Sequence, residues 1–247
     1  MDTKAENVVA DTTAVQVSSV TKKFGTRLVL GTVDLRITRG SGTCVCGVNG
    51  AGKSTLLRII AGLLKPERGT IKICGYDVSA EPEKTRSKLG LISHKSILYP
   101  ELTTSENLLF FARLYGVKDR QRRVQELLDD VGLSPYAYDR TNVLSRGMLQ
   151  RLSIARAMVH RPAVLLADEP FTGLDLEAGR HLISVLKKFR ADGGTLVMTT
   201  HDTSMALKCC DRVVVLDNSR FIFDAATSQI DTDLFMEDYL SYARSNN

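Results

Sequence analysis

Hydrophobic residues change their spacing several times along the chain, and this spacing predicts alternating strands and helices. Apolar residues alternate or cluster in Val15–Val20 and Leu28–Ile37, which predicts two antiparallel strands bounded by glycines. The short apolar run Thr43–Cys46 predicts a buried strand. Lys53–Leu64 then carries apolar side chains at helical spacing. In the first part of the chain, therefore, a buried strand leads directly into a helix.

The middle of the chain has mostly helical spacing. The segment from Thr103 to Glu106 has the spelling of a capping box, in which a Thr caps the helix and a Glu follows three residues later. We expect the helix that it starts to cover Leu108–Tyr115, and apolar faces in Val124–Val131 and Leu149–Val159 predict two more helices.

The α/β pattern returns after this helical stretch. Further strands are expected after it at Val164–Ala167, Thr195–Thr200 and Arg212–Leu216, with a helix at His181–Phe189, and one more strand is expected before it, at Thr70–Ile73. We therefore predict an α/β fold with an inserted helical lobe. Its core is residues 13–93 and 161–224, the helical subdomain is 94–160, and 225–247 is a helical C-terminal extension that includes an amphipathic tail from Asp231.

Composition sets only broad limits on function. The chain has 247 residues, 43% of them apolar and 25% charged, which is enough for a sizeable core. Its 33 basic and 28 acidic residues favour a mixed, solvated surface, and the net charge of +5 leaves nucleic acid, a nucleotide or an anionic membrane face as alternative partners. The five cysteines match no zinc pattern and predict no disulfide framework. No run of about 18 apolar residues occurs, so we expect any membrane link to go through a partner.

The segment from Gly47 to Ser54 has the complete pattern G-x-x-x-x-G-K-S between the buried strand and the helix. Glycines let the backbone N–H groups turn inward around an anion, and the helix N-terminus adds unsatisfied donors. Lys53 is placed to reach the β and γ phosphates, and the Ser54 hydroxyl to coordinate Mg²⁺. The pattern predicts that a nucleotide is bound by Gly47, Asn49, Gly50, Ala51, Gly52, Lys53, Ser54 and Thr55.

Two acidic residues end a later apolar strand. Asp168 and Glu169 directly follow the expected strand Val164–Ala167. The strand would fix both carboxylates at the edge of the sheet where α/β proteins bind ligands. We expect Asp168 to bind Mg²⁺ through a water, and Glu169 to take a proton from the attacking water or to orient it. These two motifs alone also fit a soluble P-loop kinase.

A third motif favours a different class of protein. Ser145, in the stretch "LSRGM", is a good helix N-cap, and the N–H groups after it would form a second anion site. One chain needs two phosphate sites if two copies face each other and each copy caps the other's nucleotide.

With these motifs in this order, the chain resembles an ATP-binding cassette (ABC) ATPase from about Val15 to Leu216. The resemblance implies a P-loop NTPase fold, with a RecA-like core, an antiparallel β subdomain and an inserted helical subdomain. It further implies that Phe24 stacks on adenine, that His201 senses the γ-phosphate, and that Asp175 lies in a loop pairing across the dimer. Ser145 and Gly147 would meet the opposing nucleotide. ATP and Mg²⁺ are the implied ligands.

Three positions depart from the usual family pattern. Arg146 stands where Gly is usual, and it either adds charge at the opposing phosphate or points outward. Met148 and His94 each replace a usual Gln. The family's Gln at the position of His94 contacts Mg²⁺ and water and links to the membrane subunit, and a His can donate or accept hydrogen bonds in the same way.

The resemblance implies an ATPase that powers transport by an integral membrane permease from the cytoplasmic face of the cell membrane. Two cassettes, identical or related, would form the ATP-bound dimer, and no nucleic acid is expected. Residues 90–117 and 144–175 resemble the ATP-binding subunit of the haem exporter of cytochrome c maturation. Drug and polysaccharide exporter subunits share similar segments. A non-transport ABC ATPase acting on DNA or ribosomes remains an alternative, although such chains usually carry two cassettes or a long coiled coil.

Overall fold

The computed structural model describes residues 12–93, 97–201, 203–231 and 235 of the chain. Its strands are β1 (Thr13–Phe24), β2 (Arg27–Thr38), β3 (Gly42–Cys46), β4 (Arg68–Ile73), β5 (Tyr76–Asp77), β6 (Leu89–Ile92), β7 (Val164–Asp168), β8 (Thr195–Thr200), β9 (Arg212–Asp217) and β10 (Arg220–Ala226). Its α-helices are α1 (Lys53–Ile60), α2 (Pro82–Arg86), α3 (Thr104–Leu114), α4 (Arg120–Asp130), α5 (Arg146–Met158), α6 (Leu176–Ala191) and α7 (Thr203–Cys209). Short 3₁₀ turns cover Ser134–Tyr136, Thr141–Val143 and Thr227–Gln229.

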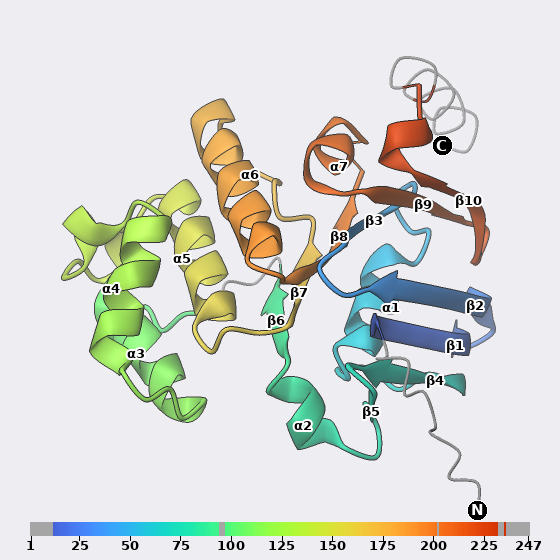
Figure 1. The fold of residues 1–247 in the computed structure, drawn as a ribbon, viewed down its shortest axis with the longest axis horizontal. Coiled ribbons are helices and arrows are strands. Elements are labelled where there is room, and N and C mark those ends of the chain that lie inside the picture. The colour runs from blue at the N-terminus through green and yellow to red at the C-terminus, as the bar shows by residue number, and fades with distance from the viewer. Residues whose placement is uncertain (1–11, 94–96, 202, 232–234, 236–247) are drawn as a thin grey trace, which may run out of the picture.

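Two sheets form the core of the fold. The larger has the order β10-β9-β3-β8-β7-β6, and its strands run parallel from β9 to β6, with β10 antiparallel at the edge. The smaller sheet, β2-β1-β4-β5, is antiparallel and lies beside α1 (Figure 1). This arrangement is the predicted α/β core with an antiparallel β subdomain.

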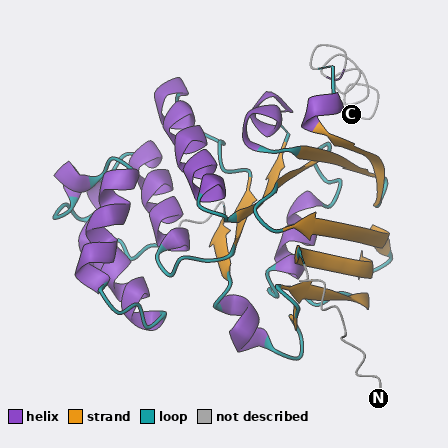
Figure 2. Ribbon diagram, in the orientation of Figure 1, coloured by secondary structure: helices purple, strands orange, loops and turns teal. Residues whose placement is uncertain are grey.

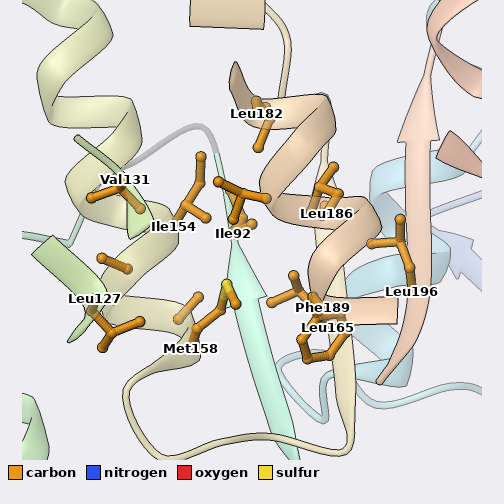
Figure 3. Packing of buried hydrophobic residues seen from close by; sticks show 14 of the residues in the cluster. Ile92, Leu127, Val131, Ile154, Met158, Leu165, Leu182, Leu186, Phe189 and Leu196 are labelled. Carbon is orange, nitrogen blue, oxygen red and sulfur yellow. The ribbon is translucent and has the colours of Figure 1, made fainter. Parts of the chain in front are cut away.

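The central strands β3, β7 and β8 are buried at every residue, and they consist mainly of apolar residues and threonines. Their side chains alternate between two hydrophobic clusters. Val45, Leu166 and Val197 face α1 and the antiparallel sheet. Leu165 and Leu196 face the opposite way, where Leu186 and Phe189 of α6 cover them (Figure 3). The sheet is thus held between two apolar layers.

The predicted helical lobe is formed by α3, α4 and α5, between β6 and β7 in the chain (Figure 2). Its first helix starts with the predicted capping box: Thr103 Oγ1 accepts from the backbone N–H of Glu106, whose carboxylate accepts in return from Thr103 N–H. Leu127 and Val131 of the lobe pack with Ile154 in the same cluster as the sheet (Figure 3). The lobe and the sheet therefore share one core.

The five cysteines are all free, as the sequence analysis expects. Cys44 and Cys46 are fully buried in β3, and burial raises the pKa of the Cys44 thiol well above its ordinary value. Burial likewise raises the pKa of Cys209 to about 12. The Cys44 and Cys209 thiols are therefore protonated near neutral pH and pack as small apolar groups.

Some elements differ from the prediction. Helix α1 ends at Ile60 rather than Leu64, because Gly62 adopts a left-handed conformation (φ +69) that ends the helix. Strands β5, β6 and β10 and helices α2 and α7 were not predicted. Strand β10 continues to Ala226, two residues into the segment expected to form the C-terminal extension, and most of the proposed tail helix lies outside the described residues.

Candidate functional site

The glycine-rich loop lies between β3 and α1, as predicted. Gly52 is the N-cap of α1 at φ +108 and provides no side-chain cap, so the loop leaves the first N–H groups of the helix without a side-chain acceptor. A Cβ atom at Gly47 would lie 2.4 Å from the Leu216 carbonyl oxygen. The loop thus combines an open helix N-terminus with a backbone packed too closely for a larger residue.

Lys53 lies inside the curve of this loop and is only 6% exposed. Its Nζ atom donates to the carbonyl oxygens of Gly47, at 2.8 Å, and Val48, at 3.2 Å. The same atom is 3.7 Å from Oε1 of Glu169. A buried ammonium held by carbonyl groups is a fixed positive charge at the mouth of the anion site.

Asp168 ends β7 and is bound by two hydroxyl groups. The hydroxyl of Ser54 donates to Oδ1 of Asp168 at 2.8 Å, and that of Thr199 donates to the same oxygen at 2.6 Å. The register of the sheet produces this contact, because Asp168 pairs with Thr199 of the neighbouring strand β8 (Figure 1). Sequence analysis missed Thr199, whose only signal is its place near the end of a buried strand, two residues before His201.

Glu169 adopts a left-handed backbone conformation (φ +50), which is uncommon for a residue with a side chain. Its N–H donates to the carbonyl oxygen of Thr199 at 3.0 Å and lies 3.2 Å from the Thr199 hydroxyl. Oε2 of Glu169 lies 2.9 Å from Nδ1 of His201. The Glu169 side chain is 10% exposed and that of His201 is 59% exposed. Residues at the end of β8 thus hold both parts of Glu169: Thr199 binds its backbone N–H, and His201 contacts its carboxylate.

A groove of about 370 Å³ opens beside these groups. It is lined by Phe24, Arg27, Val29, Asn49, Gly50, Gly52, Lys53, Ser54, Thr55 and Glu169. The ring of Phe24 is 51% exposed, so it is available for stacking. Ala51 lines the adjoining hollow of about 310 Å³. Arg27 was not predicted; it begins β2, three residues after Phe24.

The remaining predicted residues lie elsewhere. Ser145 caps α5, its hydroxyl accepting from the Met148 N–H at 3.3 Å, and neither Ser145 nor Gly147 lines the groove. Asp175 caps α6 by accepting from the Ala178 N–H at 2.8 Å. His94 lies outside the described residues.

The electrostatic character of the site comes from these placements. One ammonium and two carboxylates meet at the carboxyl ends of β3 and β7, where an open helix N-terminus also points. Such a site suits a phosphate ester whose negative charge is balanced by the loop, with carboxylates that can accept protons or hold a cation.

Among the helices that the structure describes, none combines the length and the apolar character needed to span a membrane.

Comparison with known proteins agrees with this geometry. A family model described as "ABC transporter" matches residues 30–172. The linearmycin resistance ATP-binding protein LnrL of Bacillus subtilis is 32% identical, over 84% of this chain and 67% of the relative. The Nod factor export ATP-binding protein I of Paraburkholderia xenovorans is 37% identical, over 88% of this chain and 72% of the relative.

Solved structures agree as well. An ATP-binding subunit of an ABC transporter has a TM-score of 0.84 and 30% identity, over 94% of this chain and 99% of that one. The dimeric post-hydrolysis state of the ATP-binding cassette MJ0796, bound to ADP and Pi, has a TM-score of 0.80 and 32% identity, over 86% of this chain and 98% of that one. With a family model covering more than half of its length and relatives at this identity, the chain belongs to the ABC transporter family, as an ATP-binding and ATP-hydrolysing cassette.

Proposed function

We propose that two copies of this cassette, or one copy and a related cassette, close head to tail around ATP and Mg²⁺. Hydrolysis then drives export of a small molecule through a separate integral membrane permease. The cassette would work at the cytoplasmic face of the cell membrane as a peripheral subunit.

The proposed dimer is supported by one observation in particular. The groove beside the phosphate loop is lined by residues of that loop, by Lys53 and by the carboxylate of Glu169, yet among the described residues that line it none comes from 144–148. The N-terminus of α5, capped by Ser145, is a second place with free backbone donors. A second chain that brings its own Ser145 and Gly147 to the groove would complete the donors around the terminal phosphate.

The residues of the groove fit a magnesium site of the kind completed by a nucleotide. In the described parts of the chain no cluster of three or more His, Cys, Asp or Glu side chains could hold a metal by itself. Ser54 and Asp168 offer two oxygen ligands that already lie 2.8 Å apart, and Mg²⁺ typically takes one or two protein oxygens together with phosphates and waters. We infer that these two residues hold Mg²⁺, directly or through a water at Asp168, and that it would neutralise charge on the phosphates.

The other groups have separate tasks in hydrolysis. Lys53 binds the β and γ phosphates, and Phe24 stacks on the adenine. Glu169 accepts a proton from the attacking water or orients it. His201, bonded to Glu169 at 2.9 Å and exposed on its other side, holds this carboxylate and meets the γ-phosphate. Loss of that phosphate removes the shared contacts, so the dimer opens.

The class of exported molecule rests on the named relatives, which are a linearmycin resistance protein and a Nod factor export protein. They are compatible with the alternative of a drug exporter, and they give no support to haem export or cytochrome c maturation. Membership of a transporter family also disfavours a soluble kinase or a DNA- or ribosome-directed ATPase.

Two variants test the catalytic proposal. Glu169→Gln should slow ATP turnover about 10²–10⁴-fold while ATP still binds, because only the proton acceptor is lost. It should also trap an ATP-bound dimer, measured by light scattering. Glu101→Gln, at a side chain 77% exposed on the helical lobe, is the control and should turn over ATP like the wild type. Near-normal turnover by Glu169→Gln would contradict the assignment.

Ser145→Arg tests the assignment across the dimer. It should abolish ATP-dependent dimerisation and hydrolysis while leaving binding of a fluorescent ATP analogue to the single chain unchanged. Weakened binding by the single chain would show that Ser145 acts in its own groove. For transport, co-purification with an integral membrane protein is expected, and recovery with ribosomes or DNA instead would contradict the transport proposal.

A further inference from the structure

The orientation of Arg146 fits neither of the two roles that the sequence left open, because the side chain points neither outward nor toward an opposing phosphate but at its own chain. Arg146 is the first residue of α5, directly after the N-cap Ser145. Its guanidinium lies against Gly173 of the same chain, so closely that a Cβ atom at Gly173 would come within 2.6 Å of Arg146 Cζ. Gly173 also has φ +78, a conformation that favours glycine. Arg146 therefore points toward its own chain and occupies space that only a glycine leaves open.

A second contact joins the same turn of α5 to the same loop. The side-chain amide of Gln150, one helical turn after Arg146, donates to the carbonyl oxygen of Pro170 at 3.0 Å. Gln150 thus holds the beginning of the loop between Glu169 and Asp175, and Arg146 contacts the part near its end. Inside the loop, the Thr172 N–H donates to the Glu169 carbonyl at 3.2 Å, which ties the loop to that residue.

The two carboxylates share a cavity with these contacts. A hollow of about 160 Å³ is lined by Arg146, Leu149, Gln150, Asp168, Glu169, Thr172 and Leu174. Arg146 makes no hydrogen bond or ion pair with any residue that the structure describes. Its charge is therefore not neutralised by a partner, and it adds positive potential in the hollow that it shares with Asp168 and Glu169.

We propose that Arg146 is a positioning residue that acts within its own chain. By packing on Gly173 it holds the loop after Glu169 against α5, so that the position of α5 determines the position of the Glu169 carboxylate. Since the proposed dimer places the N-terminus of α5 on the partner's nucleotide, Arg146 would couple each chain's own Glu169 to ATP in the other site. This inference rests on the proposed function.

Mixed dimers separate action within a chain from action across the dimer. Two full-length chains with different affinity tags are co-expressed, and one chain carries Glu169→Gln so that a single site remains active. The reference pairs this chain with the wild type. In the first test pair, the chain that keeps Glu169 carries Arg146→Ala. In the second, the Glu169→Gln chain carries Arg146→Ala.

The proposal predicts a fall of about tenfold in kcat for the first pair relative to the reference, with KM for ATP within about twofold. It predicts a change of less than about twofold for the second pair. A fall confined to the second pair would show that Arg146 acts on the partner's nucleotide, and it would overturn the proposal. Equal falls in both pairs, or no change in either, would overturn it too.

A measurement on the single chain remains decisive even if the dimer proposal fails. Arg146→Ala should raise the hydrogen-exchange rates of the Thr172 and Leu174 amides at least about threefold, because the loop loses its contact with α5. Arg140→Ala, at a side chain 65% exposed on the same lobe, is the control and should leave these rates unchanged. Unchanged rates in Arg146→Ala would refute the positioning role. An inactive or monomeric reference pair, in contrast, would count against the proposed dimer.

Discussion

Replacing Thr199 by Val isolates the hydrogen bond that holds the buried carboxylate of Asp168. The substitution keeps the shape of the side chain and removes the hydroxyl that donates to Oδ1 at 2.6 Å. Thr199 is fully buried and Asp168 is 5% exposed, so water cannot readily replace the lost donor. The Glu169 N–H keeps its acceptor, the Thr199 carbonyl oxygen at 3.0 Å, and the backbone should stay in place.

The expected loss follows from the charge on the acceptor. A hydrogen bond to a charged group contributes about 1.5–3 kcal/mol, and leaving a buried carboxylate short of a donor costs a similar amount. For a chain of this size, each 1 kcal/mol shifts Tm by about 2–4 °C, so Thr199→Val should lower Tm by about 3–12 °C. Differential scanning calorimetry at neutral pH without nucleotide measures this shift.

A double-mutant cycle assigns the effect to the bond itself. In an Asp168→Ala background the acceptor is absent, so Thr199→Val should cost at least about 1 kcal/mol less there than in the wild type. If the Tm of Thr199→Val stays within about 1 °C of the wild type, or if its cost is the same in both backgrounds, the bond does not stabilise Asp168 and our reasoning is wrong.

Three further changes test the fold around the site. Burial lowers the pKa of His160 to about 4, from an ordinary 6.5. The unfolded chain therefore takes up the proton first, and the free energy of unfolding should fall by at most about 3 kcal/mol as pH drops from about 6.5 to about 4. The free energy of unfolding, measured by urea unfolding at several pH values, should depend less on pH in His160→Asn between about 6.5 and 4. The same pH dependence in the variant and the wild type would contradict this assignment. Gly47→Ala should raise the Kd for ATP at least about tenfold in fluorescence titrations, because its Cβ would meet the Leu216 carbonyl at 2.4 Å; a change below about twofold would argue against this rigid packing. Asp175→Ala removes the cap of α6 and should cost about 1 kcal/mol in urea unfolding, whereas no loss would mean that the cap is dispensable.

Local patterns predicted those parts of the fold whose signals are local. Strand β8 has the predicted bounds, Thr195–Thr200, because two glycines directly precede it and its residues are β-branched or apolar throughout. The capping box marked the start of α3 in the same way. Strand β6 has only four residues and no turn signal of its own; it is a strand because it pairs with β7. The pairing of two distant segments cannot be predicted from the sequence of either segment alone.

The same limit applies to the site. Gly47 to Ser54 could be recognised because the loop and its anion-binding donors are contiguous in sequence. Thr199 acts on Asp168 only through the register of two strands that are 31 residues apart. Arg146 points at Gly173, 27 positions later, and its direction depends on how α5 packs on that loop. Roles that depend on such contacts need the structure.

The backbone at Glu169 shows why two adjacent acids can serve one groove. In a strand, successive side chains point to opposite faces, so a continued β7 would turn Glu169 away from Asp168. At φ +50 the chain leaves the strand at that residue, and Glu169 reaches Lys53 and His201 while Asp168 reaches Ser54. Such a conformation costs of order 1–3 kcal/mol, and the Thr199 carbonyl and hydroxyl that face the Glu169 N–H oppose that cost. The pair Asp168-Glu169 is thus effective only with the end of β8 beside it, which a reading of the two acids alone does not reveal.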